Sequence, residues 1–247
     1  MTGADGRFDA GVAATYDTDP ANGAPKATGP MVRRLAALAD GGPALEFAIG
    51  TGRGALPLQD AGVKVAGIDL SRAMVDRLRA KPGGAAIEVA IGDMTATRVA
   101  GYFSLVFLVF NTIDNLKTQD AQVACFANAA RHLSPGGAFV VETGVPPLRR
   151  LPPGETRLAF ARSDRHWGID EIDTATQTYT SHHAVRGPDG MRLTSVPFRY
   201  AWPAEMDLMA RMAGLTLDAR WADWTGAAFD ADSRSHVSAW RRPQADA

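Results

Sequence analysis

The sequence predicts an α/β fold, a doubly wound parallel sheet with an inserted antiparallel segment. Between residues 45 and 142, five short apolar runs alternate with segments of helical periodicity, which is the pattern of parallel strands joined by crossover helices. The first run leads into alternating glycines, Gly50, Gly52 and Gly54. Such a turn into a helix N-terminus is typical of a site for a nucleotide-like ligand. From residue 156 to 202 the pattern alternates without helical period, and this change predicts the insertion.

Length and composition limit the class of protein. The 247 residues fit one large domain or a core with an inserted subdomain, and 46% hydrophobic with 21% charged residues is ordinary for a globular protein. A formal charge of −1 gives no general attraction to nucleic acid or acidic membranes. The single Cys125 forms no internal disulfide, and no cysteine and histidine cluster has metal-ligand spacing. No leader or bilayer-length apolar stretch occurs. We therefore expect a cytoplasmic protein without nucleic-acid, membrane or metal partners.

The N-terminal residues 1–30 are rich in Gly, Ala, Asp and Pro and carry few large apolar side chains. This composition predicts a flexible arm. Tyr16 could belong to a flap over the ligand pocket, and an aromatic anchor on a mobile arm is the alternative interpretation. Apolar residues at helical spacing from 31 to 38 then predict a helix, which Gly41-Gly42-Pro43 ends.

The glycine-rich corner comes next. The apolar run from Leu45 to Ile49 predicts a buried strand. Glycine at positions 50 and 52 leaves space for a ligand and permits a positive φ where the chain reverses. Residues 55–61 predict a short helix, because Pro57 lies in its first turn, where a missing N–H is tolerated.

Two further strands each lead to a carboxylate. Residues 63–69 predict a strand ending in Asp69, which can accept both hydrogen bonds of a ribose diol. Ser71 is a candidate N-cap for the helix that follows. Residues 85–90 predict the third strand. The turn Gly92-Asp93-Met94 after it suits an adenine edge, and an ordinary capped surface turn is the alternative.

The longest apolar run, residues 103–110, predicts a central parallel strand buried on both faces. It ends in a polar cluster at residues 111–115, and the carboxyl ends of such strands face the ligand crevice. A helix is expected from Gln119 to Leu133, followed by a turn at Pro135-Gly136-Gly137 and a fifth strand over 138–142.

The pattern changes after the fifth strand. Proline-rich segments at 146–147 and 152–154 form a linker, and residues 156–202 predict a pair of antiparallel hairpins with a turn at Pro188-Asp189-Gly190.

A helix from Pro203 to Gly214 and two strands near 215–221 and 235–240 complete the core. The methionines of that helix are expected to pack in the core rather than bind a cofactor. The predicted domains are a flexible arm at 1–30, a core of 31–146 with 203–242, and an inserted β-hairpin segment at 147–202.

Together these motifs resemble the class I S-adenosylmethionine-dependent methyltransferases, particularly the small bacterial enzymes that act on small molecules. The resemblance rests on residues 46–54, on Asp69, on Gly92-Asp93-Met94 and on the turn Leu133-Ser134-Pro135-Gly136-Gly137. It covers residues 31–145 well and the terminal helix and strands loosely. It implies a Rossmann-like seven-stranded sheet whose last strand is antiparallel, and the inserted hairpins look like the substrate lid of such enzymes.

Three positions depart from the family's pattern. Ala48 stands at the first glycine of the motif, and its one added methyl group should still admit the cofactor. Ser104 stands where many members carry an acidic residue with a mostly structural role. Asn111-Thr112 stands where enzymes that methylate amino groups of nucleic acid or protein glutamine carry an acidic-Pro-Pro-Tyr-like signature. The expected acceptor is therefore a small molecule.

The resemblance implies that the cofactor is S-adenosyl-L-methionine. By this likeness the glycine corner approaches the methionine moiety with support from Glu46, Asp69 holds the ribose, and Asp93 with Met94 brackets the adenine. Phe110 and Asn111 pass beneath the transferred methyl group. The expected cofactor-binding residues are Glu46, Gly50, Thr51, Gly52, Asp69, Leu70, Asp93, Met94, Phe110 and Asn111.

The sequence leaves a catalytic base open. His166 and His182 are our candidates, with His183 and Glu142 as others, and an amine acceptor with a free lone pair needs no base. On a strand His182 and His183 face opposite sides, so at most one of them enters a given pocket. The candidate aromatic walls of the acceptor site are Tyr16, Trp167 and Tyr179.

The leading hypothesis is methyl transfer to O or N of a small molecule, such as a specialised metabolite. One alternative is an NAD(P)-dependent oxidoreductase, because residues 50–55 also satisfy Gly-x-Gly-x-x-Ala and Asp69 would serve either cofactor. Glu46, the turn at 92–94 and the lack of a Tyr-x-x-x-Lys pair oppose it. Another alternative is a methyltransferase fold that binds the cofactor without transferring methyl. Exposed hairpin edges could also pair across a homodimer.

Overall fold

A seven-stranded sheet forms the core of the structure, a computed structural model that describes residues 8–18, 28–187 and 190–244. The strand order is β10-β11-β5-β4-β1-β2-β3. Five strands are parallel, namely β1 (Ala44–Phe47), β2 (Val65–Asp69), β3 (Glu88–Ile91), β4 (Phe103–Leu108) and β5 (Leu133–Gly144). The last strand, β11 (Ser235–Arg241), runs antiparallel to both β5 and β10 (Thr216–Trp221). The expected Rossmann-like sheet with an antiparallel last strand is confirmed.

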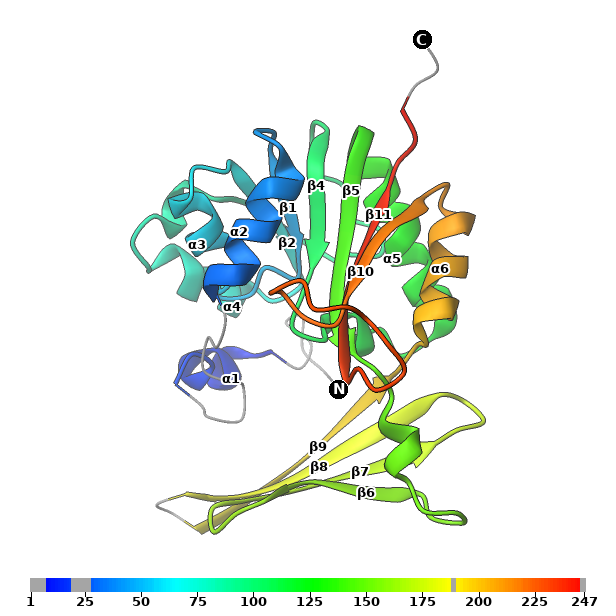
Figure 1. Cartoon of the computed structure of the whole chain (residues 1–247). Helices are drawn as coiled ribbons and strands as arrows, with labels where there is room; N and C mark the ends of the chain where they lie inside the picture. The colour runs from blue at the N-terminus through cyan, green and yellow to red at the C-terminus, as the bar shows by residue number, and fades with distance from the viewer. Residues whose placement is uncertain (1–7, 19–27, 188–189, 245–247) are drawn as a thin grey trace.

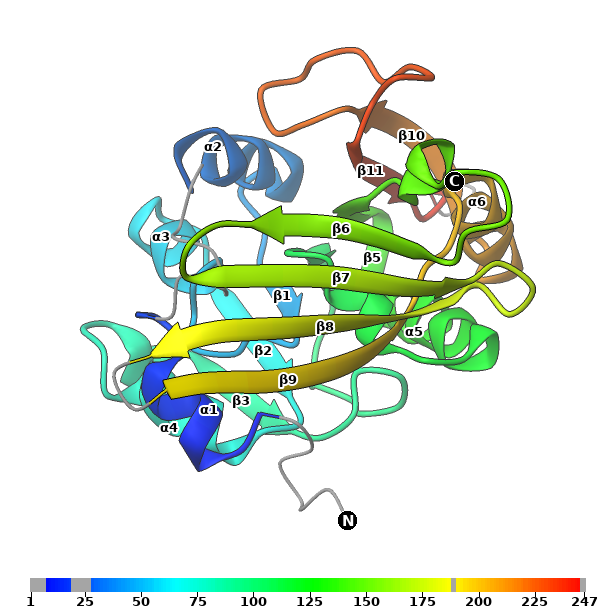
Figure 2. The same cartoon turned by 90° about the horizontal axis from the view of Figure 1, so that it is seen from below.

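Helices cover both faces of this sheet, as Figures 1 and 2 show. On one side lie α2 (Thr28–Ala39) and α3 (Ala55–Asp60), and on the other lie α5 (Gln119–His132) and α6 (Pro203–Met212). The central strand β4 contacts the helices on both faces of the sheet. Leu105 and Phe107 pack toward α2 and α3, whereas Val106 and Leu108 pack toward α5 and α6. This two-sided burial explains its uninterrupted apolar run.

Short helical elements connect the strands. Helix α4 (Arg72–Arg79) begins after Ser71, whose side chain accepts a hydrogen bond from the Met74 N–H, as the predicted N-cap requires. The 3₁₀ turns are η2 (Gly84–Ala86), η3 (Thr112–Asn115) and η4 (Pro147–Arg150).

Several strand boundaries differ from the sequence-based expectation, and the largest difference is in the fifth strand, which begins at Leu133 and includes the predicted turn Pro135-Gly136-Gly137. The third strand begins at Glu88 rather than Ala85, because Gly83 takes a φ of 76° and the chain first makes the 3₁₀ turn η2. The fourth strand ends at Leu108, because Phe110 and Asn111 take φ values of 60° and 57°, which no strand accommodates. Phe110 thus belongs to a partly buried turn rather than to the strand.

The methionine stripe of α6 is only partly in the core. Met206 and Met209 are buried, whereas Met212 is 73% exposed, because a spacing of three residues gradually turns around the helix.

A second sheet of four antiparallel strands forms the insertion. Its order is β6 (Arg157–Arg162), β7 (His166–Asp173), β8 (Thr178–Gly187) and β9 (Gly190–Arg199). It lies below the core, across the carboxyl ends of the parallel strands (Figures 1 and 2). We call these four strands the lid sheet. They fall within the predicted insertion 147–202, although residues 188–189 of the expected turn lie outside the described residues.

The predicted N-terminal arm also lies partly outside the described residues. Within residues 8–18 a short helix, α1 (Ala10–Thr15), is capped by the Asp9 side chain, which accepts from the Val12 N–H. None of the helices in the described ranges is long and apolar enough to cross a membrane.

Candidate functional site

A cavity of about 1590 Å³ lies between the carboxyl ends of the core strands and the lid sheet. Sites for one small ligand usually measure roughly 300–1,000 Å³, so this volume has room for two ligands side by side. The core supplies one end of its lining, with Gly50, Asp69 and Asp93, and the lid sheet supplies the other, with Tyr179 and His183. The position agrees with the rule that ligands of α/β sheets bind at the carboxyl ends of strands.

The three predicted residues of the glycine corner, Gly50, Thr51 and Gly52, have different surroundings. Gly50 and Gly52 both have positive φ values, 56° and 81°, as expected. Gly50 lines the cavity, whereas Gly52 lies behind it, where a Cβ atom would come 2.3 Å from Leu78 of α4. Gly52 is therefore required by helix packing. Thr51 is buried, and its hydroxyl donates to Asp17 Oδ1 at 2.6 Å.

Asp69 is anchored at the end of β2 by two backbone groups. Its Oδ2 accepts from the Gly50 N–H at 2.6 Å and its Oδ1 accepts from the Ser71 N–H at 2.8 Å. A carboxylate offers about four acceptor positions, and Asp69 lines the cavity. The fold thus fixes the orientation of the Asp69 carboxylate at the cavity wall.

Glu46 is buried beneath the same corner. Burial raises the pKa of its carboxyl well above the usual range, although a hydrogen bond from the Ala55 N–H acts in the opposite direction. Its Oε2 atom has no hydrogen-bond partner among the described residues. It borders a small side pocket of about 30 Å³, shared with Arg53 and Phe110, which is about the volume of one water molecule.

Asp93, Met94 and Leu70 line the cavity beyond Asp69. Asp93 Oδ1 accepts from both the N–H and the hydroxyl of Thr95, at 2.8 and 2.7 Å, so the turn holds the carboxylate in place. Met94 is buried while Leu70 is half exposed. An apolar side chain beside a fixed carboxylate can hold the face and edge of a purine ring.

The end of β4 turns sharply into the cavity. The Phe110 N–H donates to Glu142 Oε2 at 2.7 Å, and Asn111 Oδ1 accepts from the Gly144 N–H at 2.7 Å. Two consecutive residues in the left-handed region are held by these bonds to β5. Strain of this kind concentrates at functional sites.

Residues 16 and 17 close the cofactor end of the cavity. The Arg53 guanidinium lies over the rings of Phe110 and Tyr16, 4.0 and 5.4 Å from their centroids, and donates to the Tyr16 hydroxyl. Asp17 forms an ion pair with Lys81 at 2.8 Å and accepts from Thr51. The segment after α1 thus lies against the glycine corner. Tyr16 lines the cavity at this end, beside Arg53, rather than among the lid residues with which it was expected to form an acceptor wall.

The orphaned acceptor of Glu46, the oriented carboxylate of Asp69 and the Asp93–Met94 turn fit the cofactor that the resemblance implies. A buried acceptor suits an ammonium group, an oriented carboxylate suits a ribose diol, and a carboxylate beside an apolar side chain suits an adenine ring. A cofactor of this kind would occupy the core end of the cavity and leave the lid end for an acceptor.

Strands β7 and β8 of the lid sheet present alternate residues to the cavity, whereas β9 borders it with consecutive residues from 194 to 198. Tyr179, Ser181 and His183 of β8 line it, whereas His182 faces away and contacts Ser195 Oγ at 2.8 Å and Glu171 Oε2 at 3.4 Å. The proposed base His182 is therefore not supported, because side chains alternate across a strand.

Two more of the expected lid residues, Trp167 and His166, do not line the cavity. Trp167 lies on the outer face, 39% exposed and near Arg186, so it forms no acceptor wall. His166 stacks on His183, with ring centroids 5.2 Å apart and Nε2 2.9 Å from His183 Nδ1. Of this pair, His183 lines the cavity.

Asp114 is the cavity residue that sequence reasoning missed. It is 7% exposed in η3, and its carboxylate accepts from the Tyr179 hydroxyl at 3.0 Å and from the Thr143 hydroxyl at 3.3 Å. Burial raises the pKa of Asp114 to about 7, although these hydrogen bonds and the Arg199 charge lower it. The available signal was the polar cluster 111–115 at a strand end, which did not single out one side chain.

A second acidic group lies further along the lid. Asp170 of β7 also lines the cavity, and its Oδ1 accepts from the Ser181 hydroxyl at 2.5 Å. Burial raises the pKa of Asp170 as well. The lid end of the cavity therefore combines aromatic rings with two partly desolvated carboxyl groups.

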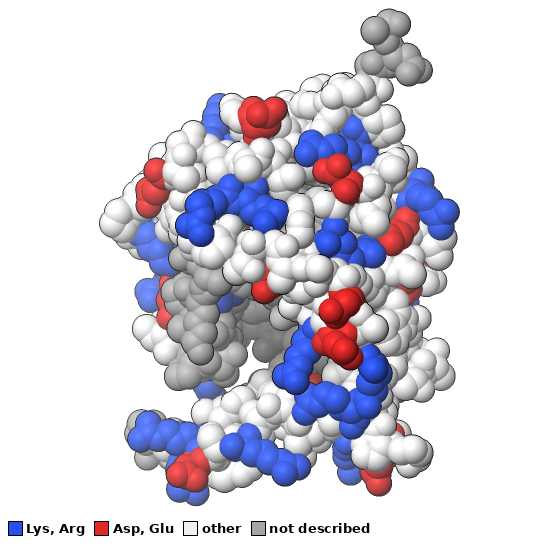
Figure 3. All heavy atoms as spheres, in the orientation of Figure 1, with Lys and Arg blue, Asp and Glu red and all other residues white. Residues whose placement is uncertain are grey.

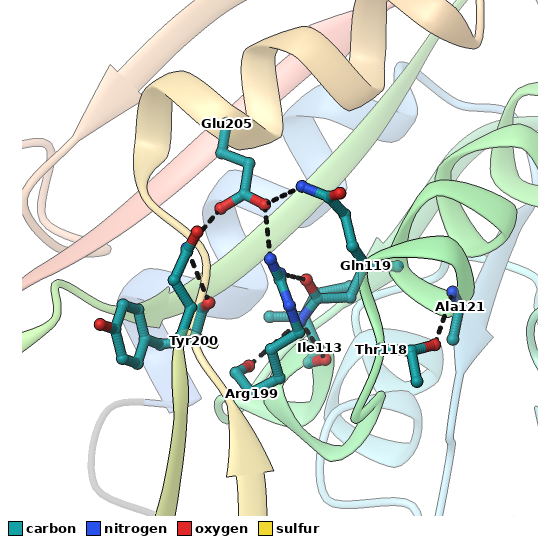
Figure 4. A network of polar contacts seen from close by, with 9 residues as sticks. Ile113, Thr118, Gln119, Ala121, Arg199, Tyr200 and Glu205 are labelled. Atoms are coloured by element: carbon teal, nitrogen blue, oxygen red, sulfur yellow. Dashed lines mark hydrogen bonds and ion pairs between the residues drawn. The ribbon is translucent and has the colours of Figure 1, made fainter. Parts of the chain in front are cut away.

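A buried polar network joins the lid sheet to the core (Figure 4). Arg199, the last residue of β9, forms an ion pair with Glu205 of α6 at 2.7 Å and donates to the Gln122 side chain of α5. Glu205 also accepts from Gln119 and Gln177, each at 2.7 Å. The base of the lid sheet is thus fixed to both helices.

The described part of the chain was also compared with the patterns of metal and nucleic-acid sites. Within the described ranges no three His, Cys, Asp or Glu residues come together in an arrangement that could hold a metal ion. On the face shown in Figure 3, Lys and Arg are interspersed with Asp and Glu. That face therefore lacks the clustered basic residues typical of nucleic-acid binding.

Known proteins resemble this chain in sequence and in structure. Residues 44–137 match the family model described as a methyltransferase domain. The solved structure of the CcbJ methyltransferase from Streptomyces caelestis superposes with a TM-score of 0.84 and 38% identity, covering 98% of each chain.

Two relatives are also similar in sequence. A cypemycin N-terminal methyltransferase from a Streptomyces species is 29% identical over 79% of this chain and 81% of the relative. A dTDP-3-amino-3,4,6-trideoxy-alpha-D-glucopyranose N,N-dimethyltransferase from Streptomyces venezuelae is 35% identical over 40% of each chain. These relatives favour methyl transfer over the nicotinamide oxidoreductase alternative.

Proposed function

This chain belongs to the family of S-adenosylmethionine-dependent methyltransferases, and from that premise we propose that it methylates an amine nitrogen of a small specialised metabolite. The enzyme uses S-adenosyl-L-methionine and acts on a small molecule. The choice of nitrogen over oxygen is the finer proposal. Two relatives whose names specify N-terminal and N,N-dimethyl transfer support it.

The observation that carries the proposal is the division of the cavity. Its core end has the acceptors that suit the cofactor, and its lid end carries Asp114 and Asp170 beside Tyr179. Carboxylates in a partly desolvated site favour a cationic or hydrogen-bond-donating acceptor over an anionic one. An amine meets this requirement.

The bound cofactor supplies an electrophilic methyl carbon on its sulfonium. At the core end, Asp69 would accept from the ribose hydroxyls and Asp93 would accept from the adenine edge, with Met94 and Leu70 against the ring. Glu46 would meet the ammonium group through the small pocket beside Gly50. Phe110 and Asn111, held in strained geometry by β5, would form the floor below the methyl group.

The protein contributes to rate mainly by positioning. A methyl transfer needs the acceptor lone pair close to the methyl carbon and collinear with the breaking bond. The lid sheet, which lies below the core in Figure 1, and residues 8–18 at the side border the site. Pairing of two copies through hairpin edges and a cytoplasmic location stay predictions.

Calorimetry tests the cofactor assignment. The protein should bind S-adenosylmethionine and its demethylated product, and Asp69→Asn should weaken that binding by about 1.5–3 kcal/mol, because a hydrogen bond to a charged group contributes that much. Asp60→Asn is the matched control, since Asp60 is the last residue of α3 and lies outside the cavity lining. Unchanged affinity in Asp69→Asn would remove that residue from the ribose.

The acceptor assignment is tested by release of the demethylated product. A panel of small amines, including amino sugars, is compared with the corresponding alcohols. Turnover restricted to alcohols would contradict N-methylation and leave the cofactor assignment intact.

A further inference from the structure

Asp114 stands out as a buried titratable group whose role is not explained by cofactor binding. Its 3₁₀ turn follows directly after the strained pair Phe110–Asn111, and its own N–H donates to the Asn111 carbonyl at 3.1 Å. The side chain is 7% exposed yet lines the cavity, on the side of the lid sheet. A carboxyl group in this position lies between the expected methyl group and the acceptor end.

We propose that Asp114 is the general base of the reaction, which takes a proton from the ammonium form of the acceptor, and that Tyr179 is its positioning residue. This inference rests on the proposed function, because it requires an amine acceptor. It also narrows the acceptor to primary or secondary amines that are protonated at neutral pH.

The proton moves from the ammonium group of the acceptor to Asp114 before the methyl group is transferred. The ammonium N–H bond breaks and an O–H bond forms on Asp114, which leaves a neutral acid and a neutral amine. The nitrogen lone pair then forms the bond to the methyl carbon while the carbon–sulfur bond breaks and its electron pair stays on sulfur. The methylated ammonium product leaves, and Asp114 returns its proton to solvent. No oxidant or second reactant is needed.

The surroundings of Asp114 suit this role. A base works best when its pKa is near the working pH, and burial raises the pKa of Asp114 to about 7. Tyr179 and Thr143 donate to its two oxygens and so orient the carboxylate. Beyond these partners, the elements packed against η3 carry Arg192 and Arg199 of β9 and Glu142 of β5 as charged or titratable groups. Tyr200 directly follows β9, and Lys117 lies on the linker after η3.

Other acidic groups suit the role less well. Glu142 uses Oε2 to hold the Phe110 N–H and so maintains the strained turn. Asp170 lies on the lid sheet, where its partner Ser181 is two residues beyond Tyr179 on the same face of β8, so Ser181 is about 7 Å further along the strand than the residue that contacts Asp114. Asp114 is therefore the carboxylate best placed to receive the proton.

The first test compares Asp114→Asn with the wild-type enzyme across pH. General base catalysis contributes typically 10²–10⁴-fold, so we expect kcat/KM at pH 7 to fall at least about 100-fold. Activity of the variant should recover as pH rises, because free amine then becomes abundant without a base. Affinity for the demethylated cofactor product, measured by calorimetry, should stay unchanged. Glu171→Gln, on the outer face of the lid sheet, is the matched control and should keep the wild-type profile.

A second variant keeps the carboxylate and distinguishes a chemical role from a structural one. The Tyr179 hydrogen bond lowers the pKa of Asp114, so Tyr179→Phe should raise that pKa. The acidic limb of the rate profile should therefore move to higher pH. Difference infrared spectroscopy of the Asp114 carboxyl, titrated in the free protein, should show the same shift and needs no turnover.

The outcomes separate this inference from the proposed function. Turnover and pH dependence that are unchanged in Asp114→Asn would overturn the base assignment while N-methylation stands. An infrared titration showing Asp114 fully ionised at pH 5 would also overturn it. Failure of the wild type to bind either form of the cofactor would instead contradict the proposed function.

Discussion

At the scale of single residues, Ala48 carries strain at the glycine corner. Its φ is 52°, in the left-handed region, at the position where the family usually has glycine. An L-residue there loses roughly 1–2 kcal/mol, while glycine loses roughly 0.5–1 kcal/mol through chain entropy. The alanine methyl group is thus tolerated at a cost to stability.

Ala48→Gly should therefore stabilise the protein by up to about 1 kcal/mol, a rise of roughly 2–4 °C in Tm for a chain of this size. Thermal unfolding by circular dichroism measures it. Ala37→Gly is the matched control, because Ala37 is exposed within α2, where glycine should destabilise by about 1 kcal/mol. A fall in Tm for both variants would show that the strain at Ala48 is negligible.

The positions of single residues were predictable where they depend on local conformation, while their roles stay predictions. Gly50 and Asp69 were assigned from turn chemistry and strand ends, and both line the cavity. Gly52 was assigned to ligand approach, yet its constraint is the Leu78 side chain. The Asp114–Tyr179 contact joins residues 65 positions apart. No local pattern encodes such a pairing, because it depends on how the lid sheet docks on the core.

At the scale of elements, the junction between lid sheet and core depends on one buried ion pair. The side chains of Arg199 and Glu205 are 6% and 14% exposed. Although burial opposes it, hydrogen bonds from Arg199, Gln177 and Gln119 hold the pKa of Glu205 below its usual range. A lowered pKa means that this contribution to stability is present at neutral pH and is lost as pH falls into the acidic range.

Glu205→Gln should cost about 3 kcal/mol or more, because it leaves the Arg199 charge buried without its partner. Denaturant unfolding at pH 7 measures this cost. The acceptor KM should rise while cofactor affinity stays unchanged, since the network holds the lid end of the cavity. The control is Asp218→Asn, which breaks the exposed pair with Arg241 and should cost no more than about 1 kcal/mol. Equal costs for the two variants would contradict an anchoring role for the network.

Element types and order were predictable because each has a local signal. Alternation over 156–202 indicated antiparallel strands, and four of them are present. The face that each strand turns to the cavity was not predictable, since alternation defines two faces without naming the inner one. Hence His182 and Trp167 were expected in the site together with Tyr179, although only Tyr179 of these three lines the cavity.

At the scale of the whole molecule, the cavity is closed from two directions. The lid sheet covers the acceptor end, and residues 8–18 lie against the glycine corner and α4. The lid is fixed by buried contacts, whereas the N-terminal closure depends on half-exposed ones. The side chains of the Asp17–Lys81 pair are each 31% exposed. The weaker closure is therefore the one expected to open for cofactor exchange.

Asp17→Asn should accelerate that exchange. The variant loses the ion pair with Lys81 and weakens the bond from Thr51, contacts that together contribute about 1–2 kcal/mol after screening by solvent. The demethylated product should therefore dissociate roughly 5- to 30-fold faster in stopped-flow displacement, and high salt should produce a similar effect in the wild type. Hydrogen exchange over residues 8–18 should increase in parallel. Asp76→Asn is the control, because Asp76 forms an exposed pair with Arg79 on α4 and should change neither rate. Faster dissociation without faster exchange in residues 8–18 would mean that Asp17 acts on the glycine corner itself rather than through the closure.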